Sequence, residues 1–238
     1  MSTESAQQHF SGEVVVDLNA ITVTRVPPYD AGLDGVSLRL RHGELALVLL
    51  EQGAWDHPLP DVISGLLPVV SGEVTVFGNS WVGMGPDRQA HARSRIGRVF
   101  ERRGWMSNLD VDENITLAQR HHTMRPVDEI LSEAENLARM VNVPRLPAGR
   151  PASVEREQLR RCEWVRAALG SPWLMLLERP GQDLVRGWRK PCAALVNHRR
   201  ASGTAVLWLC EDEEEWNDKS LNPSLKLRAE ANTLKAES

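Results

Sequence analysis

The residues most suggestive of chemistry lie in a turn between two apolar segments, within residues 43–78. Leu45–Leu50 is continuously apolar and indicates a buried strand, and Gly53 marks a turn after it. A strand, a turn and the start of a helix, in that order, are typical of a loop that binds phosphate. The chemistry expected of such a loop is recognition of phosphate oxygens by backbone N–H groups.

The residues of this loop do not match the template G-x-x-x-x-G-K-[ST]. Leu50 and Trp55 stand at its two Gly positions, Asp56 at its Lys position and His57 at its Ser/Thr position. A carboxylate beside a triphosphate is repulsive, and one close contact between unit charges is worth ~4 kcal/mol at an effective dielectric of ~20. Asp56 suits a helix start better, because the helix dipole favours negative charge there. The loop positions that would contact a nucleotide are Gly53, Ala54, Asp56 and His57.

Length and composition exclude several classes of protein. The chain has 238 residues, enough for one large α/β domain, with 42% hydrophobic and 25% charged residues. A net charge of -4 gives no reason to expect a nucleic-acid partner. No apolar run approaches the ~20 residues that span a bilayer. Three widely spaced cysteines and no recognisable signal peptide indicate a reduced, cytosolic protein, without metal spacing.

The elements around the loop predict an α/β fold with an added antiparallel subdomain. Residues 13–26 alternate apolar and polar positions, and a second alternating strand ends at Gly43, so we expect an antiparallel sheet within the first ~80 residues. Residues 86–95 predict a polar, basic helix, and residues 96–100 predict a short buried strand.

The second half of the chain alternates predicted helices and buried strands. A helical insert covers residues 114–143, interrupted near Pro126, and another helix follows residue 153. Buried strands are expected at residues 173–177 and 203–210, with a helix at 183–200 between them. We expect residues 1–12 to be a disordered lead, 13–216 to form the domain with a helical subdomain at about 101–170, and 217–238 to be a flexible tail.

The order and spacing of these segments resemble the nucleotide-binding subunit of ABC transporters over residues 13–216. Four segments carry the resemblance: LDGVSLRLRHGEL with SGLLPVVSGEVTVFG, IGRVFERRGWMSNLDVDENITL, RRCEWVRAALGSPWLMLLERPGQDL and GTAVLWLCED. The resemblance implies an ABC-type P-loop NTPase fold, with a RecA-like core, an antiparallel β-subdomain and a helical insert. Within ABC subunits, the chain most resembles the ATPase of Mla (MCE) phospholipid-transport systems, through Thr24-Arg25, ENITLAQRHHT, Arg160-Arg161 and PGQD.

The resemblance also implies which positions would act on ATP, and they are replaced. Glu101 stands at the Q-loop Gln, Glu178 at the Walker B Asp and Arg179 at the catalytic Glu, so no general base remains there. Glu211, or Cys210 if the register shifts by one, stands at the switch His. The signature LSGGQ is replaced by Val154, Glu155, Arg156, Glu157 and Gln158.

Loss of both the Walker A loop and the signature means that neither composite ATP site of a dimer would be complete. If the fold is kept, Asp56, Glu101, Glu178 and Glu211 converge with Arg179 and His57 nearby, and we expect a buried Arg–carboxylate network in place of Mg-ATP. A divalent cation among these carboxylates is the minority alternative. His121-His122 is not expected to bind metal, because adjacent helix residues point apart. Residues 155–157 are expected to be a solvated first helical turn.

The surface that meets a membrane permease in such subunits is retained. Arg102, Arg103, Trp105 and Met106 would supply its charged and apolar contacts, although packing between subdomains explains Trp105 and Met106 equally well.

Our leading hypothesis is a pseudo-ATPase, a cytoplasmic structural subunit held peripherally at the inner (cell) membrane by a permease, with no cofactor expected. A second copy or a related ABC subunit and an MCE-domain protein are further expected partners, and lipid is the expected cargo. The alternative is an ABC ATPase with divergent motifs that hydrolyses Mg-ATP, and a free regulator with the same fold is a third possibility.

Overall fold

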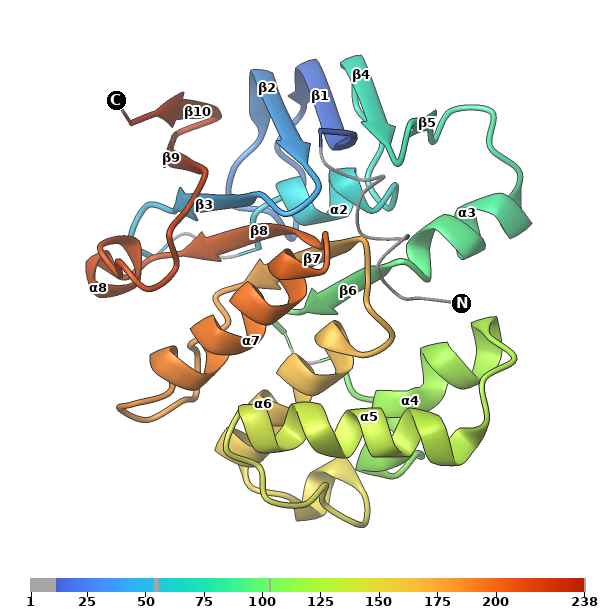
Figure 1. The fold of residues 1–238 in the computed structure, drawn as a ribbon. Helices are drawn as coiled ribbons and strands as arrows, with labels where there is room; N and C mark the ends of the chain where they lie inside the picture. The colour runs from blue at the N-terminus through green and yellow to red at the C-terminus, as the bar shows by residue number, and fades with distance from the viewer. Residues whose placement is uncertain (1–11, 54–55, 103, 238) are drawn as a thin grey trace.

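The computed structural model describes residues 12–53, 56–102 and 104–237, and their strands form two sheets (Figure 1). The smaller sheet is antiparallel, in the order β2 (Leu33–Arg41), β1 (Val14–Val23), β4 (Ser71–Val76) and β5 (Asn79–Ser80). Its strands alternate buried and exposed residues, as the sequence predicts for a half-buried sheet.

The larger sheet has six strands, five of which are parallel. Its strands lie in the order β10 (Thr233–Ala236), β9 (Leu225–Glu230), β3 (Leu45–Leu49), β8 (Ala205–Cys210), β7 (Leu174–Glu178) and β6 (Ile96–Val99). The three central strands are buried along their whole length, because elements cover both faces of this sheet.

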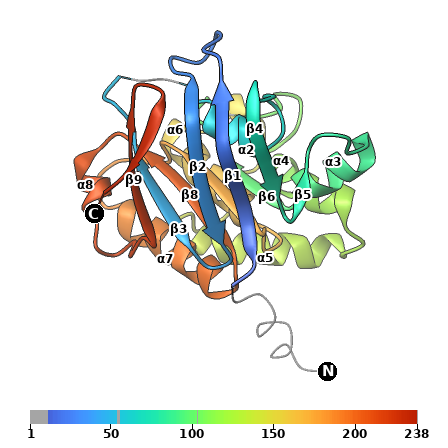
Figure 2. The same ribbon diagram turned by 90° about the horizontal axis from the view of Figure 1, so that it is seen from above.

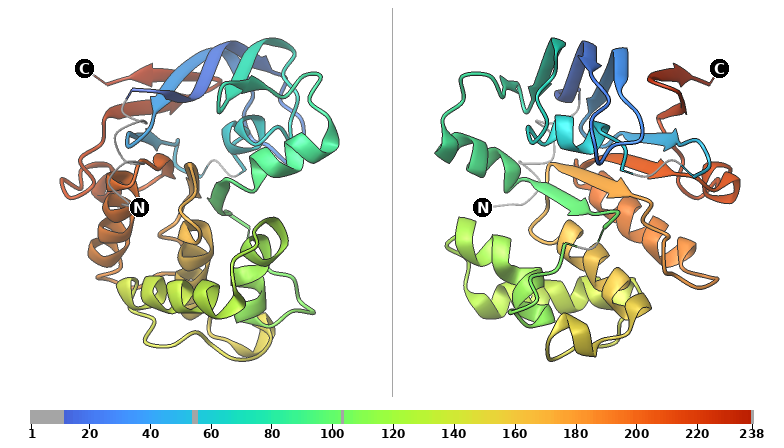
Figure 3. Two further views of the ribbon diagram at one scale, coloured as in Figure 1. Left: turned by 45° about the vertical axis from the view of Figure 1, so that its right-hand side comes forward. Right: turned by 180° about the vertical axis from the view of Figure 1, so that it is seen from behind.

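Alternate residues of β3 divide the core into two clusters. Ala46 and Val48 face the antiparallel sheet and α2 (Leu59–Ile63), whereas Leu45, Leu47 and Leu49 face the helices. The larger sheet therefore lies between the antiparallel sheet and the helical layer, as Figures 1 and 3 show.

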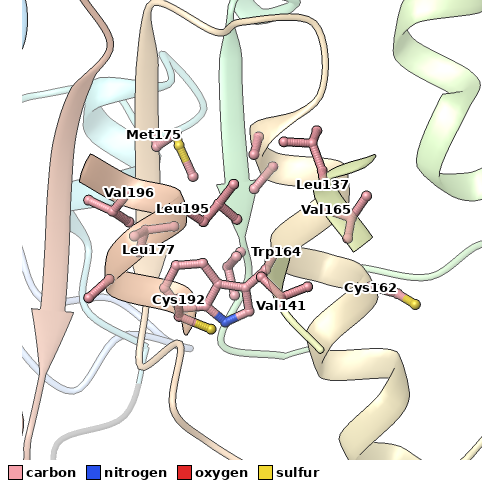
Figure 4. Packing of buried hydrophobic residues seen from close by; sticks show 14 of the residues in the cluster. Leu137, Val141, Cys162, Trp164, Val165, Met175, Leu177, Cys192, Leu195 and Val196 are labelled. Atoms are coloured by element: carbon pink, nitrogen blue, oxygen red, sulfur yellow. The ribbon is translucent and has the colours of Figure 1, made fainter. Parts of the chain in front are cut away.

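The helical layer is formed by the middle and the last third of the chain. Its members are α4 (Val111–His122), α5 (Val127–Met140), α6 (Arg156–Ala168) and α7 (Arg189–Ala201), with a 3-10 turn at Pro151–Ser153. Figure 4 shows Trp164 of α6 in one buried cluster with Leu195 and Val196 of α7 and Leu177 of β7. A Cβ on Gly97 of β6 would lie 1.7 Å from the carbonyl oxygen of Ala167, so α6 contacts this strand backbone to backbone.

Two shorter helices complete the fold. The chain reaches β6 through α3 (Pro86–Arg93), which lies beyond β5 at one side of the molecule (Figure 2). At the opposite side, α8 (Glu213–Trp216) follows β8. No helix of the described part of the chain has the length and apolar character needed to cross a membrane.

The structure agrees with the predicted antiparallel subdomain and with helices inside residues 101–170, and it corrects two predictions. The flexible tail predicted at 217–238 is wrong, because β9 pairs with β3 inside the main sheet and β10 pairs with β9. The helix predicted at 183–200 begins only at Arg189. Of the predicted disordered lead, residues 1–11 lie outside the described residues.

Candidate functional site

The loop after β3 contains the residues predicted to contact a nucleotide. Its backbone binds a carboxylate from elsewhere in the same chain. The backbone N–H of Asp56 donates a hydrogen bond to Oε2 of Glu101, at 2.9 Å. The Asp56 carboxylate lies 2.5 Å from Nη2 of Arg102. Gly53 and Asp56 both adopt positive φ angles, +81° and +48°. Ala54 and Trp55 lie outside the described residues. A backbone donor at the predicted phosphate position is therefore already engaged by a carboxylate.

Arg179, which is predicted to stand at the position of the catalytic Glu, joins two of the predicted carboxylates. Its side chain is buried, and Nη1 lies 3.4 Å from Oε1 of Glu101 and 3.1 Å from Oε2 of Glu211. Burial raises the pKa of Glu101, and the positive charge of Arg179 opposes this rise. Arg179 has a φ of +40°, a conformation that costs a non-glycine residue on the order of 1 kcal/mol. The surrounding contacts hold the backbone in this strained conformation.

Glu178 belongs to a second charged cluster, which the sequence analysis did not predict. The guanidinium of Arg98, on β6, donates to Glu178 and lies 2.6 Å from Oδ1 of Asp61, on α2. The Tyr29 hydroxyl donates to the other Asp61 oxygen, at 2.7 Å. Burial raises the pKa of Glu178, whereas Arg98 lowers it. A charged residue within a short buried strand was the available signal for this cluster, because a buried charge requires a partner.

The two clusters line one small cavity. It has a volume of about 250 Å³ and is bounded by residues of both clusters, among them Asp56, Glu101, Arg98 and Glu178. This volume falls below the roughly 300–1,000 Å³ typical of small-molecule pockets. His57 also lines it, and burial together with Arg179 lowers the pKa of His57 to about 4, so its imidazole is neutral at pH 7.

A larger cavity lies on the other side of the loop. It measures about 530 Å³ and is lined by Arg25, Glu51, Gly53 and the turn between β9 and β10. The Ala231 N–H of this turn donates to Oε1 of Glu51 at 2.9 Å. The C-terminal hairpin therefore contributes a wall to the space beside the loop.

The signature positions form the beginning of α6, as a solvated turn would. Glu155 caps this helix and Arg156 begins it, both exposed. Glu157 accepts a hydrogen bond from Arg161, four residues on, at 2.7 Å. Val154 is half-buried against the core, and Gln158 is half-buried in the first turn.

Of the positions predicted to contact a permease, one is packed against the core and others are exposed. Trp105 is half-buried against the core, with the Arg166 guanidinium 4.8 Å from its ring centre. Met106 is 51% exposed, and its N–H donates to Oδ1 of Asn114 at 2.8 Å. Arg102 is exposed while it pairs with Asp56, and Arg103 lies outside the described residues. Among the described residues, no group of three or more His, Cys, Asp or Glu could hold a metal ion, and His121-His122 belongs to no such group.

A buried ion pair lies behind the site, and the sequence patterns did not lead us to predict it. Arg160 and Glu163 of α6 are almost fully buried and lie 2.6 Å apart. Arg160 also donates to the carbonyl oxygens of Phe100, at 2.7 Å, and Gln182, at 3.0 Å. The spacing of three residues between Arg160 and Glu163 was the signal. This Arg ties α6 to the loops that carry Glu101 and Arg179.

Comparisons with known proteins find sequence similarity to ATP-binding proteins of import systems. The chain is 28% identical over 212 residues to the methionine import ATP-binding protein MetN of Rhizobium johnstonii, covering 89% of this chain and 58% of that protein. It is 26% identical over 184 residues to the spermidine/putrescine import ATP-binding protein PotA of Nitratidesulfovibrio vulgaris, covering 77% and 48%. The chain thus spans about half the length of these curated relatives. No family model matches the chain.

Solved structures show the same fold. The dimeric ABC transporter cassette MJ0796 superposes with a TM-score of 0.79 at 18% identity, covering 94% of this chain and 98% of that one. An ATP-binding subunit of an ABC transporter gives 0.78 at 17% identity, covering 94% and 89%. These matches confirm the predicted ABC-type fold.

Proposed function

Because the chain is homologous to ABC transporter ATP-binding subunits and shares their fold, we propose that it is a degenerate cassette, a pseudo-ATPase that serves as a structural subunit of a membrane transporter. Its own side chains fill the place of Mg-nucleotide. It folds without a ligand, and its role in the transporter is structural rather than hydrolysis of ATP.

The observation that carries the proposal is the hydrogen bond from Asp56 N–H to Glu101. In a phosphate-binding loop the backbone N–H groups point at phosphate oxygens. Here a carboxylate takes one of these donors, and Arg179 neutralises that carboxylate from the other side. A triphosphate would have to displace Glu101 and would then face the carboxylates of Asp56, Glu178 and Glu211. Each such close contact opposes binding by several kcal/mol at most.

The chemistry of hydrolysis is also unsupported. A general base must lie near the attacking water and accept its proton. Arg179 stands at that position, and a guanidinium is protonated at every physiological pH. Neutral His57 could accept a proton, but its Nδ1 already accepts a hydrogen bond from the Leu59 N–H, at 3.3 Å.

The partners that fit this role are a permease and a second cassette. The relatives are named as ATP-binding proteins of import systems, and one structural neighbour is a dimer. We place the chain in the cytoplasm, peripheral to the membrane, with the surface around Met106 toward the permease. Lipid cargo and an MCE-domain partner remain predictions from the sequence resemblance, whereas the relatives are named for import of methionine or of spermidine/putrescine.

The test is thermal unfolding of the chain with and without Mg-ATP. We expect no rise in melting temperature and no phosphate release above a blank. A cassette with an intact Lys in its loop, measured in the same buffer, is the positive control. Nucleotide at a hundred times its Kd stabilises by about 2.7 kcal/mol, which raises the melting temperature of a chain this size by roughly 5–10 °C. A rise of that size would overturn the proposal.

The second candidate is an ABC ATPase with divergent motifs, and the 530 Å³ cavity beside Gly53 favours it. That cavity is within the size range of ligand pockets and reaches Arg25. Binding of nucleotide that is lost in Gly53→Trp, together with turnover, would support this candidate.

A further inference from the structure

A basic cavity lies at the opposite end of the parallel strands from the loop that carries Asp56. It occupies about 410 Å³ between α3, β5 and the residues that precede β7. Arg95 precedes β6 and Trp173 precedes β7, whereas Arg98, Glu178 and Arg179 lie toward the carboxyl ends of the same strands. Five residues of strand separate the two ends by about 16 Å. The cavity is therefore distinct from the candidate site.

The charge of this cavity is positive although the chain is acidic overall. Arg88, His91 and Arg95 line it, and none of the described lining residues is Asp or Glu. Residues 88, 91 and 92 follow helical spacing on α3, so they share one face. Nη2 of Arg95 lies 3.0 Å from Nε2 of His91, which places the guanidinium beside the imidazole. The Arg88 side chain is exposed and makes no hydrogen bond or ion pair with any residue in the described ranges.

The remaining walls suit the organic part of a ligand. Arg95 stacks on Trp173, 3.9 Å from the ring centre, and Phe77 meets the same ring edge-on at 5.4 Å. Met84 and Val82 add apolar surface, while Asn79 and Ser80 add polar groups. The last carbonyls of α3 are already used, since Ser94 and Arg95 N–H groups donate to Ala90 and Ala92. The walls thus combine two arginine side chains with aromatic and apolar groups.

We propose that this cavity binds a phosphomonoester group. A phosphomonoester carries about -1.5 to -2 charges at pH 7, which matches two guanidinium groups and an imidazole better than a single carboxylate does. Arginine is well suited to this role because its planar guanidinium donates two parallel hydrogen bonds to phosphate oxygens. The group can belong to a soluble metabolite or to a lipid headgroup.

Calorimetric titration with glycerol 3-phosphate tests the proposal, and vesicles with and without phosphatidic acid form its second arm. Binding in the first arm assigns a soluble ligand, and binding in the second alone assigns a headgroup. We expect Arg88→Glu to weaken either interaction at least tenfold, because it reverses a charge at the cavity mouth. Ala92→Glu, which fills the cavity and leaves its cations in place, should have the same effect. Arg145→Glu, an equal change of charge on an exposed loop, should have none.

Absence of binding to both probes at concentrations on the order of 10 mM, well above a millimolar Kd, would overturn the proposal. Binding that Arg88→Glu and Arg145→Glu weaken equally would overturn it too, since that result reports net charge alone. Arg88 and Ala92 line neither of the cavities beside the loop at Asp56, so the effect of changing them is independent of that loop.

Discussion

The backbone N–H of Asp56 and the carboxylate of Glu101 are joined across 45 residues by a hydrogen bond of 2.9 Å. Glu101 therefore contacts both the loop and Arg179, and we expect its removal to destabilise both. Glu101→Ala should lower the free energy of unfolding in urea by about 3 kcal/mol, because it leaves a backbone donor unsatisfied and removes a carboxylate that neutralises the buried Arg179 guanidinium. Glu73→Ala, at an exposed position of β4, should change it by less than about 0.5 kcal/mol. Similar small losses in both variants would contradict this role for Glu101.

Arg98 separates two carboxylates that would otherwise face each other. Arg98→Met should cost about 3–5 kcal/mol at pH 7, because Asp61 and Glu178 lose their shared cation in a buried site. The matched control is Arg39→Met, which breaks an exposed pair with Asp17 and should cost no more than about 1 kcal/mol. Chemical denaturation of both variants measures the difference, and equal costs would show that the Arg98 cluster contributes little.

Restoring the charge of the Walker A Lys should not restore ATP turnover. In Asp56→Lys, Arg179 still stands at the position of the general base, and Glu101 still accepts from the loop. We expect phosphate release from Mg-ATP to remain at the level of the unmodified chain. Hydrolysis by this single variant, confirmed to be lost again when Gly53→Trp blocks the loop, would contradict the proposed pseudo-ATPase function.

Stability should depend on pH through Glu215, a buried carboxyl on α8. Burial raises its pKa to about 7, above the ordinary value of 4.5, and Trp208 Nε1 donates to its Oε2 at 3.0 Å. Because the folded state binds this proton more tightly, the stabilisation is full below about pH 4.5 and is lost as the pH rises through 7.

Glu215→Gln keeps the acceptor and removes the titration. At pH 8 it should therefore be more stable than the unmodified chain by up to about 3 kcal/mol, and the difference should vanish near pH 4. Urea unfolding curves followed by tryptophan fluorescence at both pH values measure this. Glu73→Gln, at an exposed carboxyl, is the control that should show no such trend. A difference that is the same at both pH values would refute the assignment.

The proposed contact with a permease should depend on Met106 more than on other exposed methionines. Met106→Asp should abolish co-purification with a multi-spanning membrane protein, because it places a charge in an apolar contact. Met124→Asp changes a fully exposed side chain and should leave co-purification intact. Melting temperatures of both variants should match that of the unmodified chain, since neither side chain is buried. Equal retention of the membrane protein by both variants would remove Met106 from the interface.

The parts of the fold that could be predicted are those with local patterns. Leu45–Leu49 and Ala205–Cys210 are apolar runs, and α5 has apolar residues at helical spacing, so burial alone identifies them. β9 escaped prediction because its sequence LKLRAE offers two buried apolar side chains between charged ones. Its place in the sheet depends on β3, some 180 residues earlier, and no local pattern reports that pairing.

In the candidate site, too, some contacts could be predicted from the sequence, whereas others depend on long-range pairing. Glu101, Arg179 and Glu211 were expected together from the family resemblance, and the structure brings them together. Glu178 was expected in the same network, yet it pairs with Arg98, which has no place in the family motifs. Three of the eight tryptophans, unexplained by sequence alone, pack on one another: Trp164, Trp188 and Trp208. Such pairings depend on which helices and strands become neighbours in the fold.

The hairpin of β9 and β10 has a practical consequence for anyone shortening the chain. Ending it at residue 216, where motif boundaries suggest, would uncover the side of β3 that now pairs with Leu225–Glu230. A bare row of amides and carbonyls on an apolar ribbon recruits strands from other molecules. Such a truncated product would be recovered as insoluble aggregate, and its failure could be mistaken for the absence of a stabilising nucleotide.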